Sequence, residues 1–175
     1  MTAHTISPVA FPAVGTYCID PERSSVRYAG RHMFGLGVVH ATFRINSGEI
    51  QIADPPTAST VTISIDANSF ASGNAKRDKV VRSATLLDTA TYPDIAFNSS
   101  NLRWDGDHWL LGGPVTAHGV TADVELKFDR VVQEPLGIRV QARAEHLDRH
   151  AFGVKGSRGW VGRHLDLDFD IYAAL

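Results

Sequence analysis

The chain has 175 residues, with 17 basic against 19 acidic side chains and a formal net charge of −2. This length predicts one domain, large enough for a substantial core or for a barrel around a cavity. No block of Lys and Arg supplies the positive surface that nucleic acid requires, so no nucleic-acid partner is expected. Cys18 is the only cysteine, which excludes an internal disulfide and a cysteine-based metal site.

The N-terminal sequence, MTAHTISPVAFPAVGTY, lacks the basic start of a secretory signal, and Pro8 and Pro12 interrupt its only apolar run. Nowhere does the chain approach the ~18–20 consecutive apolar residues that a membrane-spanning helix needs. We therefore expect a cytoplasmic protein without stable membrane insertion. Residues 1–14 are predicted to form a flexible N-terminal arm, and residues 15–175 a single domain.

The first half of the chain alternates apolar and polar residues with period two, which is typical of strands with one buried face. Within residues 24–34 the in-phase positions are Val26, Tyr28, Gly30, His32 and Phe34. Two later runs continue the alternation with Val39, Ala41, Phe43 and Ile45, and with Val61, Ile63 and Ile65. Between these runs, Ser47-Gly48 predicts a bend or bulge.

The segment 66–100 interrupts this pattern with helical spacing. Its apolar residues at that spacing are Val80, Val81, Ala84 and Leu87. Asn74 is the predicted N-cap, because its amide oxygen can accept from an unpaired backbone N–H, and Tyr92-Pro93 blocks further helix. We expect one short helix, over about residues 76–87, that covers an opening or an end of the strand structure.

Alternation resumes after Pro93 and continues to the C-terminus. The in-phase apolar residues are Ile95 and Phe97; Val124, Leu126 and Phe128; Ile138, Val140, Ala142 and Ala144; and Leu165, Leu167, Phe169 and Ile171. In total, roughly eight strands with short connections predict an antiparallel sheet or barrel. One short helix cannot cover so much apolar surface, so the strands must close on themselves or pair with a second sheet. An eight-stranded barrel is either filled by side chains or holds one small ligand.

Several motifs, in order along the chain, resemble those of the YceI-like family. They are Ile19-Asp20-Pro21 with Ser25 and His32; Asp66, Ser69, Asn74, Arg77-Asp78, Leu87-Asp88, Tyr92-Pro93, Phe97 and Ser99; the sequence GPVTAHGVT at 113–121; and Asp148-Arg149 with Phe152-Gly153. The similarity extends from about Tyr17 to the C-terminus. Three departures, at Ser24-Ser25, at His40-Ala41 and at Pro114, affect the expected ligand more than the expected fold.

This family is a lipocalin-like group of antiparallel barrels associated with polyisoprenoids and other long-chain amphiphiles. The resemblance therefore implies an all-β fold with one short helix: an eight-stranded antiparallel lipocalin-like β-barrel that encloses an apolar cavity. Residues 15–175 would form this single YceI-like barrel domain. Many family members carry a secretory signal, and none is recognised in this sequence, so a periplasmic role is not expected.

The inward-facing apolar side chains are the candidate ligand-binding residues. At ~0.8 kcal/mol per buried CH₂, a chain of about a dozen carbons gains on the order of 10 kcal/mol before the costs of association. Helix residues are included because the helix is expected to close one end of the barrel. The candidates are Tyr28, His32, Phe34, Phe43, Ile63, Phe70, Val80, Ala84, Leu87, Phe97, Phe128 and Phe169. Alternatively, these side chains simply fill a core.

His32 raises a second hypothesis, because it is a polar residue in phase with an apolar lining. It could bind the head of a ligand, or it could act as acid and base in an enzyme for a lipid-like or polyketide-like substrate. The simpler interpretation is a buried imidazole that a backbone group satisfies. The sequence has no Gly-x-Ser-x-Gly motif and no HExxH spacing, so no catalytic residue, metal or cofactor is assigned.

The charged pairs Arg77-Asp78 and Asp148-Arg149 are interpreted as structural. Asp78 suits the positive end of the helix dipole, and Arg77 is expected to pair with a nearby carboxylate. Asp148-Arg149 is expected to clamp a loop close to Phe152. Neither pair is assigned to the ligand.

The sequence thus predicts non-enzymatic binding, storage or transport of a polyisoprenoid, an isoprenoid quinone or a similar long-chain amphiphile. A filled barrel that serves as an interaction module is a further alternative. A homodimer also stays open, since exposed strand edges favour pairing, but no residue specifies the interface.

Overall fold

The computed structural model describes residues 11–175, which form ten β-strands, one α-helix and three single-turn 3₁₀ helices. The strands are β1 (Gly15–Ile19), β2 (Ser25–His32), β3 (Gly37–Ile52), β4 (Thr60–Ala71), β5 (Asp94–Asn98), β6 (Asn101–Trp104), β7 (Trp109–Ala117), β8 (Val120–Glu134), β9 (Gly137–Asp148) and β10 (Val161–Ala174). The α-helix is α1 (Ala75–Arg82), and the 3₁₀ helices are η1 (Pro21–Arg23), η2 (Pro56–Ala58) and η3 (Arg149–Phe152).

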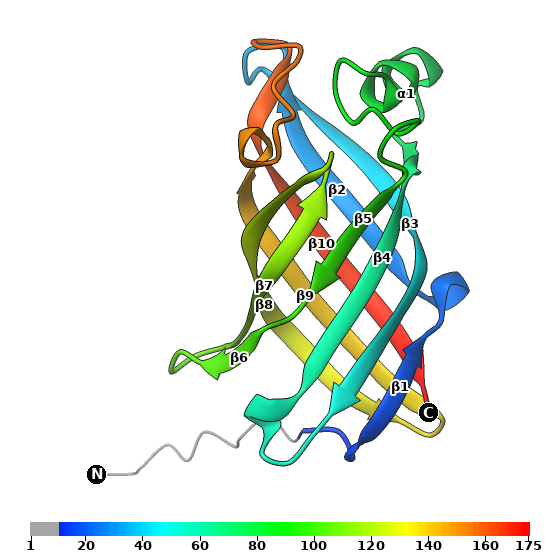
Figure 1. Ribbon diagram of the computed structural model, residues 1–175, viewed down its shortest axis with the longest axis vertical. Coiled ribbons are helices and arrows are strands. Elements are labelled where there is room, and N and C mark those ends of the chain that lie inside the picture. Colours follow the sequence, from blue (N-terminus) through cyan, green and yellow to red (C-terminus); the bar gives the residue numbers. More distant parts are fainter. Residues whose placement is uncertain (1–10) are drawn as a thin grey trace.

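Eight strands close into a ring in the order β2-β3-β4-β5-β7-β8-β9-β10, with β10 pairing back to β2, and every pair is antiparallel (Figure 1). The predicted fold, an eight-stranded antiparallel barrel with one short helix, is therefore confirmed. The remaining two strands extend the ring. β1 pairs with both β3 and β10 beyond the start of β2, and β6 pairs with β7.

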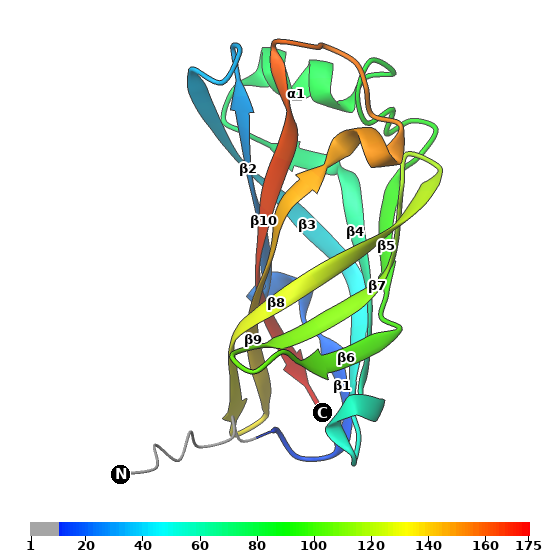
Figure 2. The same cartoon turned by 90° about the vertical axis from the view of Figure 1, so that its left-hand side faces the viewer.

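The two ends of the barrel differ. One end, which we call the helix end, carries α1, the β2–β3 hairpin, η3 and the β9–β10 loop (Figure 2). The other, the terminal end, carries β1, the β8–β9 turn and the C-terminus. Alternation within each strand sends one set of side chains into the barrel and the other toward solvent.

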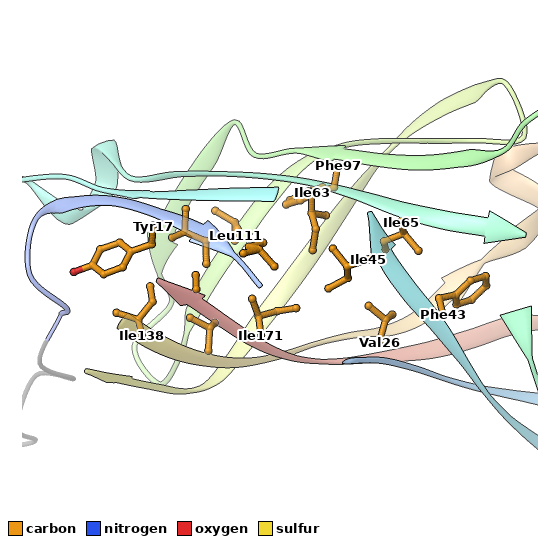
Figure 3. Close-up of a cluster of buried hydrophobic side chains, with 14 of the residues drawn as sticks. Tyr17, Val26, Phe43, Ile45, Ile63, Ile65, Phe97, Leu111, Ile138 and Ile171 are labelled. Atoms are coloured by element: carbon orange, nitrogen blue, oxygen red, sulfur yellow. The ribbon is translucent and has the colours of Figure 1, made fainter. Parts of the chain in front are cut away.

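Side chains fill the barrel toward its terminal end. Tyr17, Val26 and Ile138 have no exposed surface, and Leu111 is 2 % exposed; these side chains converge in one cluster (Figure 3). β1 contributes Tyr17 and Ile19 to this cluster, at a place where β2 has not yet begun. This packing leaves a small cavity of about 50 Å³ next to Phe11 and Trp109, and the larger open space lies farther along the barrel.

Residues 11–13, which belong to the predicted N-terminal arm, pack against the barrel. The Phe11 ring meets the Trp109 ring edge to face, with 4.9 Å between centroids, and Pro12 is buried. The backbone of Ala13 is held from both sides: its N–H donates to Gln133 Oε1, and its carbonyl accepts from the Tyr17 hydroxyl. Phe11, Pro12 and Ala13 thus contact the barrel, whereas Val14 is 66 % exposed; residues 1–10 of the predicted arm lie outside the described part of the chain.

The predicted bend at Ser47-Gly48 is present as a register shift between Ile45 and Ser47 in the pairing of β3 with β4. A Cβ atom at Gly48 would lie 2.7 Å from the carbonyl oxygen of Thr62, so only glycine fits there without a backbone shift. The bulge lets the 16-residue β3 bend around the barrel.

Candidate functional site

A cavity of about 200 Å³ runs inside the barrel and reaches the helix end. All the ring strands contribute to its wall, and only Tyr28 and Arg149 bring polar groups to it. The apolar lining consists of Ile19, Phe43, Ile50, Val61, Ile63, Ile65, Phe70, Val81, Leu86, Leu87, Ile95, Phe97, Leu111, Val115, Ala117, Val124, Leu126, Phe128, Val140, Ala142, Ala144, Leu147, Phe152, Val154, Val161, Leu165, Leu167, Phe169 and Ile171. Such a wall excludes water and favours an apolar occupant.

The structure brings eight of the twelve candidate residues together on this wall. They are Tyr28, Phe43, Ile63, Phe70, Leu87, Phe97, Phe128 and Phe169. Seven come from the strands, and for six of them period two predicts the inward face; Phe70 is out of phase with Ile63 and Ile65 of the same strand but is also buried. The other four candidates, His32, Phe34, Val80 and Ala84, lie outside the lining, and each does so for a local reason.

Phe34 was expected to point inward, and this expectation is wrong: its side chain is 75 % exposed. β2 ends at His32, and both Met33 (φ 50°) and Phe34 (φ 56°) adopt left-handed backbone conformations. A strand cannot continue through such residues, so the inward alternation stops two positions before Phe34. The ring instead faces Trp160 of the β9–β10 loop, at 5.9 Å between centroids.

His32 is half-buried at the last position of β2 and pairs across the hairpin with Gly37. Its imidazole lies over the Cα of Gly37, where a Cβ atom would collide with the ring. The side chain is therefore directed at the rim of the barrel and not at the cavity. The hypothesis that His32 acts within the lining is not supported by its position.

Helix α1 is shorter than the spacing predicts, because it ends at Arg82 and not near Leu87. Ser83 stops it in an extended conformation, with its N–H and its hydroxyl both donating to the Val80 carbonyl. Ala84 therefore lies beyond the helix and is exposed, while Val80, within the helix, is 48 % exposed, so the expectation that these two residues line the cavity is wrong.

The turn after α1 supplies lining residues that the helical spacing missed. The N–H of Leu87 donates to the Val81 carbonyl at 2.9 Å, which folds the chain back under the helix. Leu86, only 3 % exposed, then joins Val81 and Leu87 on the wall. A helical phase cannot identify Leu86, because its direction is set by the turn.

Contacts with the end of β4 hold α1 over the barrel. The predicted N-cap is confirmed, since the Asn74 side chain accepts from the Arg77 N–H at 3.0 Å. Asp78, 8 % exposed, accepts from the N–H and the hydroxyl of Ser72, and the same hydroxyl accepts from Arg77 Nε at 2.8 Å. Arg77 and Asp78 thus fix the helix, although Arg77 binds Ser72 and not the carboxylate that was expected.

Among residues 11–175, Arg149 is the one charged residue of the wall, and it is 6 % exposed. Its guanidinium donates to the carbonyls of Gly162, Val154 and Val161 at 2.8, 2.7 and 3.0 Å, which clamps the β9–β10 loop as the sequence suggests. Within residues 11–175 no carboxylate lies within 4 Å of this guanidinium. Three of its five N–H donors are used in this way, which leaves two for another acceptor.

Tyr28 is the second polar group of the wall. Burial raises the pKa of its hydroxyl, and the positive charge of Arg149 acts in the opposite direction. For Arg149, loss of solvent lowers the pKa, but a guanidinium remains protonated because its ordinary pKa is above 12. A neutral hydroxyl and a buried cation therefore meet the otherwise apolar space.

The surroundings of His150, in η3, indicate that the stability of the folded protein depends on pH. Burial and the nearby charges of Arg149 and Arg163 lower the pKa of His150, whose Nε2 is buried without a partner. The unfolded chain binds this proton below about pH 6.5, before the folded chain does, so unfolding becomes easier as pH falls from about 6.5 through the lowered pKa of the folded state.

Urea unfolding between pH 7.5 and pH 5 measures this effect. We expect His150→Gln to flatten the loss of stability on acidification. His40→Gln, at an exposed position, serves as the control and should keep the slope of the unmodified protein. An unchanged slope in the His150 variant would contradict the assignment.

In 11–175 no three His, Cys, Asp or Glu side chains are grouped closely enough to hold a metal ion. Helix α1 has eight residues, and no helix in this part of the chain has the length and apolar character to cross a membrane.

Known proteins are similar to this chain in sequence and in fold. The YceI-like domain model matches residues 17–173. Protein YceI of Escherichia coli O157:H7 is 32 % identical over 158 residues, which cover 86 % of this chain and 82 % of that protein. A UPF0312 protein of Pseudomonas putida is 33 % identical over 169 residues, with 89 % and 84 % covered.

Solved structures agree on the fold. BcnA of Burkholderia cenocepacia superimposes with a TM-score of 0.79 at 20 % identity, covering 89 % of this chain and 99 % of that one. A polyisoprenoid binding domain from Saccharophagus degradans gives a TM-score of 0.68 at 18 % identity, covering 93 % and 99 %. The family model spans nearly the whole barrel, and relatives above 30 % identity cover most of the chain, so the protein belongs to the YceI-like family.

Proposed function

We propose that this protein binds a long-chain amphiphile of the polyisoprenoid type, without chemical conversion, in the cavity of the barrel. The observation that carries the proposal is the wall itself, on which only Tyr28 and Arg149 interrupt an otherwise apolar lining. The polyisoprenoid binding domain of Saccharophagus degradans has the same fold and supports this ligand class. An apolar chain gains ~0.8 kcal/mol for each CH₂ that enters such a space.

The two polar groups of the wall give the ligand a direction. Arg149 and Tyr28 would receive the polar end of the amphiphile, because a buried cation with free N–H donors is stabilised by an acceptor. The apolar chain would then extend toward the packed cluster around Leu111 and Ile171. Isoprenoid alcohols, phosphates and quinones all have such a polar end.

Extraction of the purified protein with organic solvent, followed by mass spectrometry, tests the proposal. A recovered isoprenoid or similar amphiphile, in near-stoichiometric amount, is the expected result. Protein stripped of lipid should then bind prenols of increasing length, with affinity rising about fourfold for each added CH₂ until the cavity is full. If no lipid is recovered and no prenol binds, the proposal is wrong.

A larger side chain inside the cavity should compete with the ligand for space. Ala144 lies on β9, is 1 % exposed and lines the wall. We expect Ala144→Phe to lower prenol affinity about tenfold or more, because the ring occupies space that the chain would take. Ala84→Phe is the matched control: it makes the same change at an exposed position outside the lining, and affinity should be unchanged. Equal affinity in both variants would show that the chain binds elsewhere.

The enzyme alternative rested on His32 within the lining. Since His32 lies at the rim, against Gly37, no observation on the described residues favours that alternative over binding.

A further inference from the structure

Large apolar side chains are exposed together at one side of the helix end. Met33, Phe34 and Leu36 of the β2–β3 hairpin are 45, 75 and 87 % exposed, and Trp160 of the β9–β10 loop is 60 % exposed. We call these four residues the apolar tip. Hairpin and loop lie side by side at the top of both views (Figures 1 and 2). A soluble protein rarely exposes such a group of side chains without a partner for it.

Hydrogen bonds join the two parts of the tip into one unit. The N–H of Met33 donates to the Trp160 carbonyl at 2.9 Å, and the N–H of Phe34 donates to the Gly159 carbonyl at 2.6 Å. Met33 and Phe34 hold left-handed backbone conformations that bulky residues rarely adopt. The backbone is thus fixed in a form that directs Phe34 outward, although an inward position in the barrel would bury it.

Basic side chains accompany the tip in the sequence. The stretches of chain that contain it, 24–48 and 149–165, have no Asp or Glu. Arg31 and Arg158, each two residues before a tip residue, are exposed, as is Lys155 of the same loop, and within residues 11–175 none of the three forms an ion pair with a carboxylate. The whole protein is nevertheless acidic, with a net charge of −2, so this basic region is a local feature of the helix end.

The tip is continuous with the cavity. Val161, the residue after Trp160, lines the wall, and its carbonyl accepts from the wall residue Arg149. A lipid that left a bilayer at the tip would therefore meet the apolar lining within one residue of the exposed tryptophan.

We infer that the apolar tip docks on the surface of an anionic lipid bilayer. Trp and Phe side chains settle at the level of the lipid headgroups, and nearby cations are attracted to anionic lipid within about a Debye length. Exchange of an amphiphile between bilayer and cavity rests on the proposed function. Docking itself does not, because the tip meets the bilayer whether or not the cavity holds a ligand.

Flotation with vesicles tests the docking. Protein should float with phosphatidylcholine vesicles that contain phosphatidylglycerol, and less at high salt. Leu36→Ser should weaken binding about tenfold or more, from the loss of one inserted leucine side chain. Leu136→Ser is the matched control, since Leu136 is 76 % exposed in the β8–β9 turn at the opposite end, and binding should not change. Equal loss in both variants, or no flotation of the unmodified protein, would overturn the inference.

A second variant keeps the test independent of folding. Asn and Gly adopt left-handed conformations readily, so Met33→Asn combined with Phe34→Gly should be at least as stable as the unmodified protein yet should not float.

Sedimentation of the unmodified protein tests whether the tip instead binds a second copy of this chain. If the tip variants abolish self-association and the protein does not bind vesicles, the tip is a dimer interface and the inference is wrong. If vesicles bind but no lipid is extracted from the cavity and no prenol binds, docking stands and the proposed function fails.

Discussion

Leu87→Asp should abolish most lipid uptake, with a loss of at least about a hundredfold in prenol affinity. Leu87 lies on the wall after α1, where the hydrogen bond from its backbone N–H to the Val81 carbonyl holds it. A carboxylate at this position would be removed from water by an entering apolar chain, and an unpaired charge in such surroundings costs several kcal/mol. Binding of a fluorescent prenol analogue to lipid-free protein measures the effect.

Val80→Asp is the matched control for this experiment. It introduces the same charge on the same segment, but Val80 is 48 % exposed and does not line the cavity. Its stability should stay within about 0.5 kcal/mol of the unmodified protein, and its affinity should be unchanged. If a folded Leu87 variant takes up lipid as well as the Val80 variant does, the segment after α1 does not contact the ligand.

Arg149→Met should destabilise the protein by about 3 kcal/mol or more, because three buried or partly buried backbone carbonyls lose their donor at once. For a protein of this size, that corresponds to a fall in Tm of roughly 6–12 °C. The β9–β10 loop should also become sensitive to limited proteolysis, since these bonds connect its start, at Arg149, to its middle and its end. Thermal unfolding and urea titration measure the first effect, and peptide mapping of the digest measures the second.

Arg163→Met provides the comparison. Arg163 is exposed and binds Asp148, through Nε at 3.0 Å and a terminal nitrogen at 2.7 Å. It makes no hydrogen bond to the three carbonyls that Arg149 binds. Solvent screens such a pair, so only a small change in Tm is expected. If both variants lose stability to the same small extent, the clamp is not a major contributor and Arg149 is available chiefly for the ligand.

The alternation of apolar and polar residues predicted an antiparallel sheet or barrel, and the resemblance to the YceI-like family selected the closed barrel. Period two in eight runs requires that one face of each strand be buried, and one short helix cannot bury so many faces, so the strands must close on themselves or pair with a second sheet. The same periodicity placed Phe43, Ile63, Phe97, Phe128 and Phe169 on the wall. Within a regular strand, the direction of a side chain depends only on its position in the sequence.

Only the tertiary structure shows which way the side chains at the ends of helices and strands point. Phe34 and Ala84 are in phase with lining residues, but their elements stop before them, at His32 and Arg82. Leu86 is out of phase, and a turn directs it inward. Where an element ends depends on local hydrogen bonds, such as that from Ser83 to Val80, and these compete with periodicity without leaving a periodic signal.

The character of the cavity also needed the fold. The sequence identifies Asp148-Arg149 as a structural pair, and it contains no sign that Arg149 joins the wall, because the carbonyls that hold it belong to residues 154, 161 and 162. Whether the barrel is filled or hollow depends on the sum of side-chain volumes around the ring, which no single strand determines. The sequence by itself determined an antiparallel strand structure with one apolar face; the closure of the ring, the main cavity beneath α1 and the place of Arg149 in its wall depend on how distant strands pack.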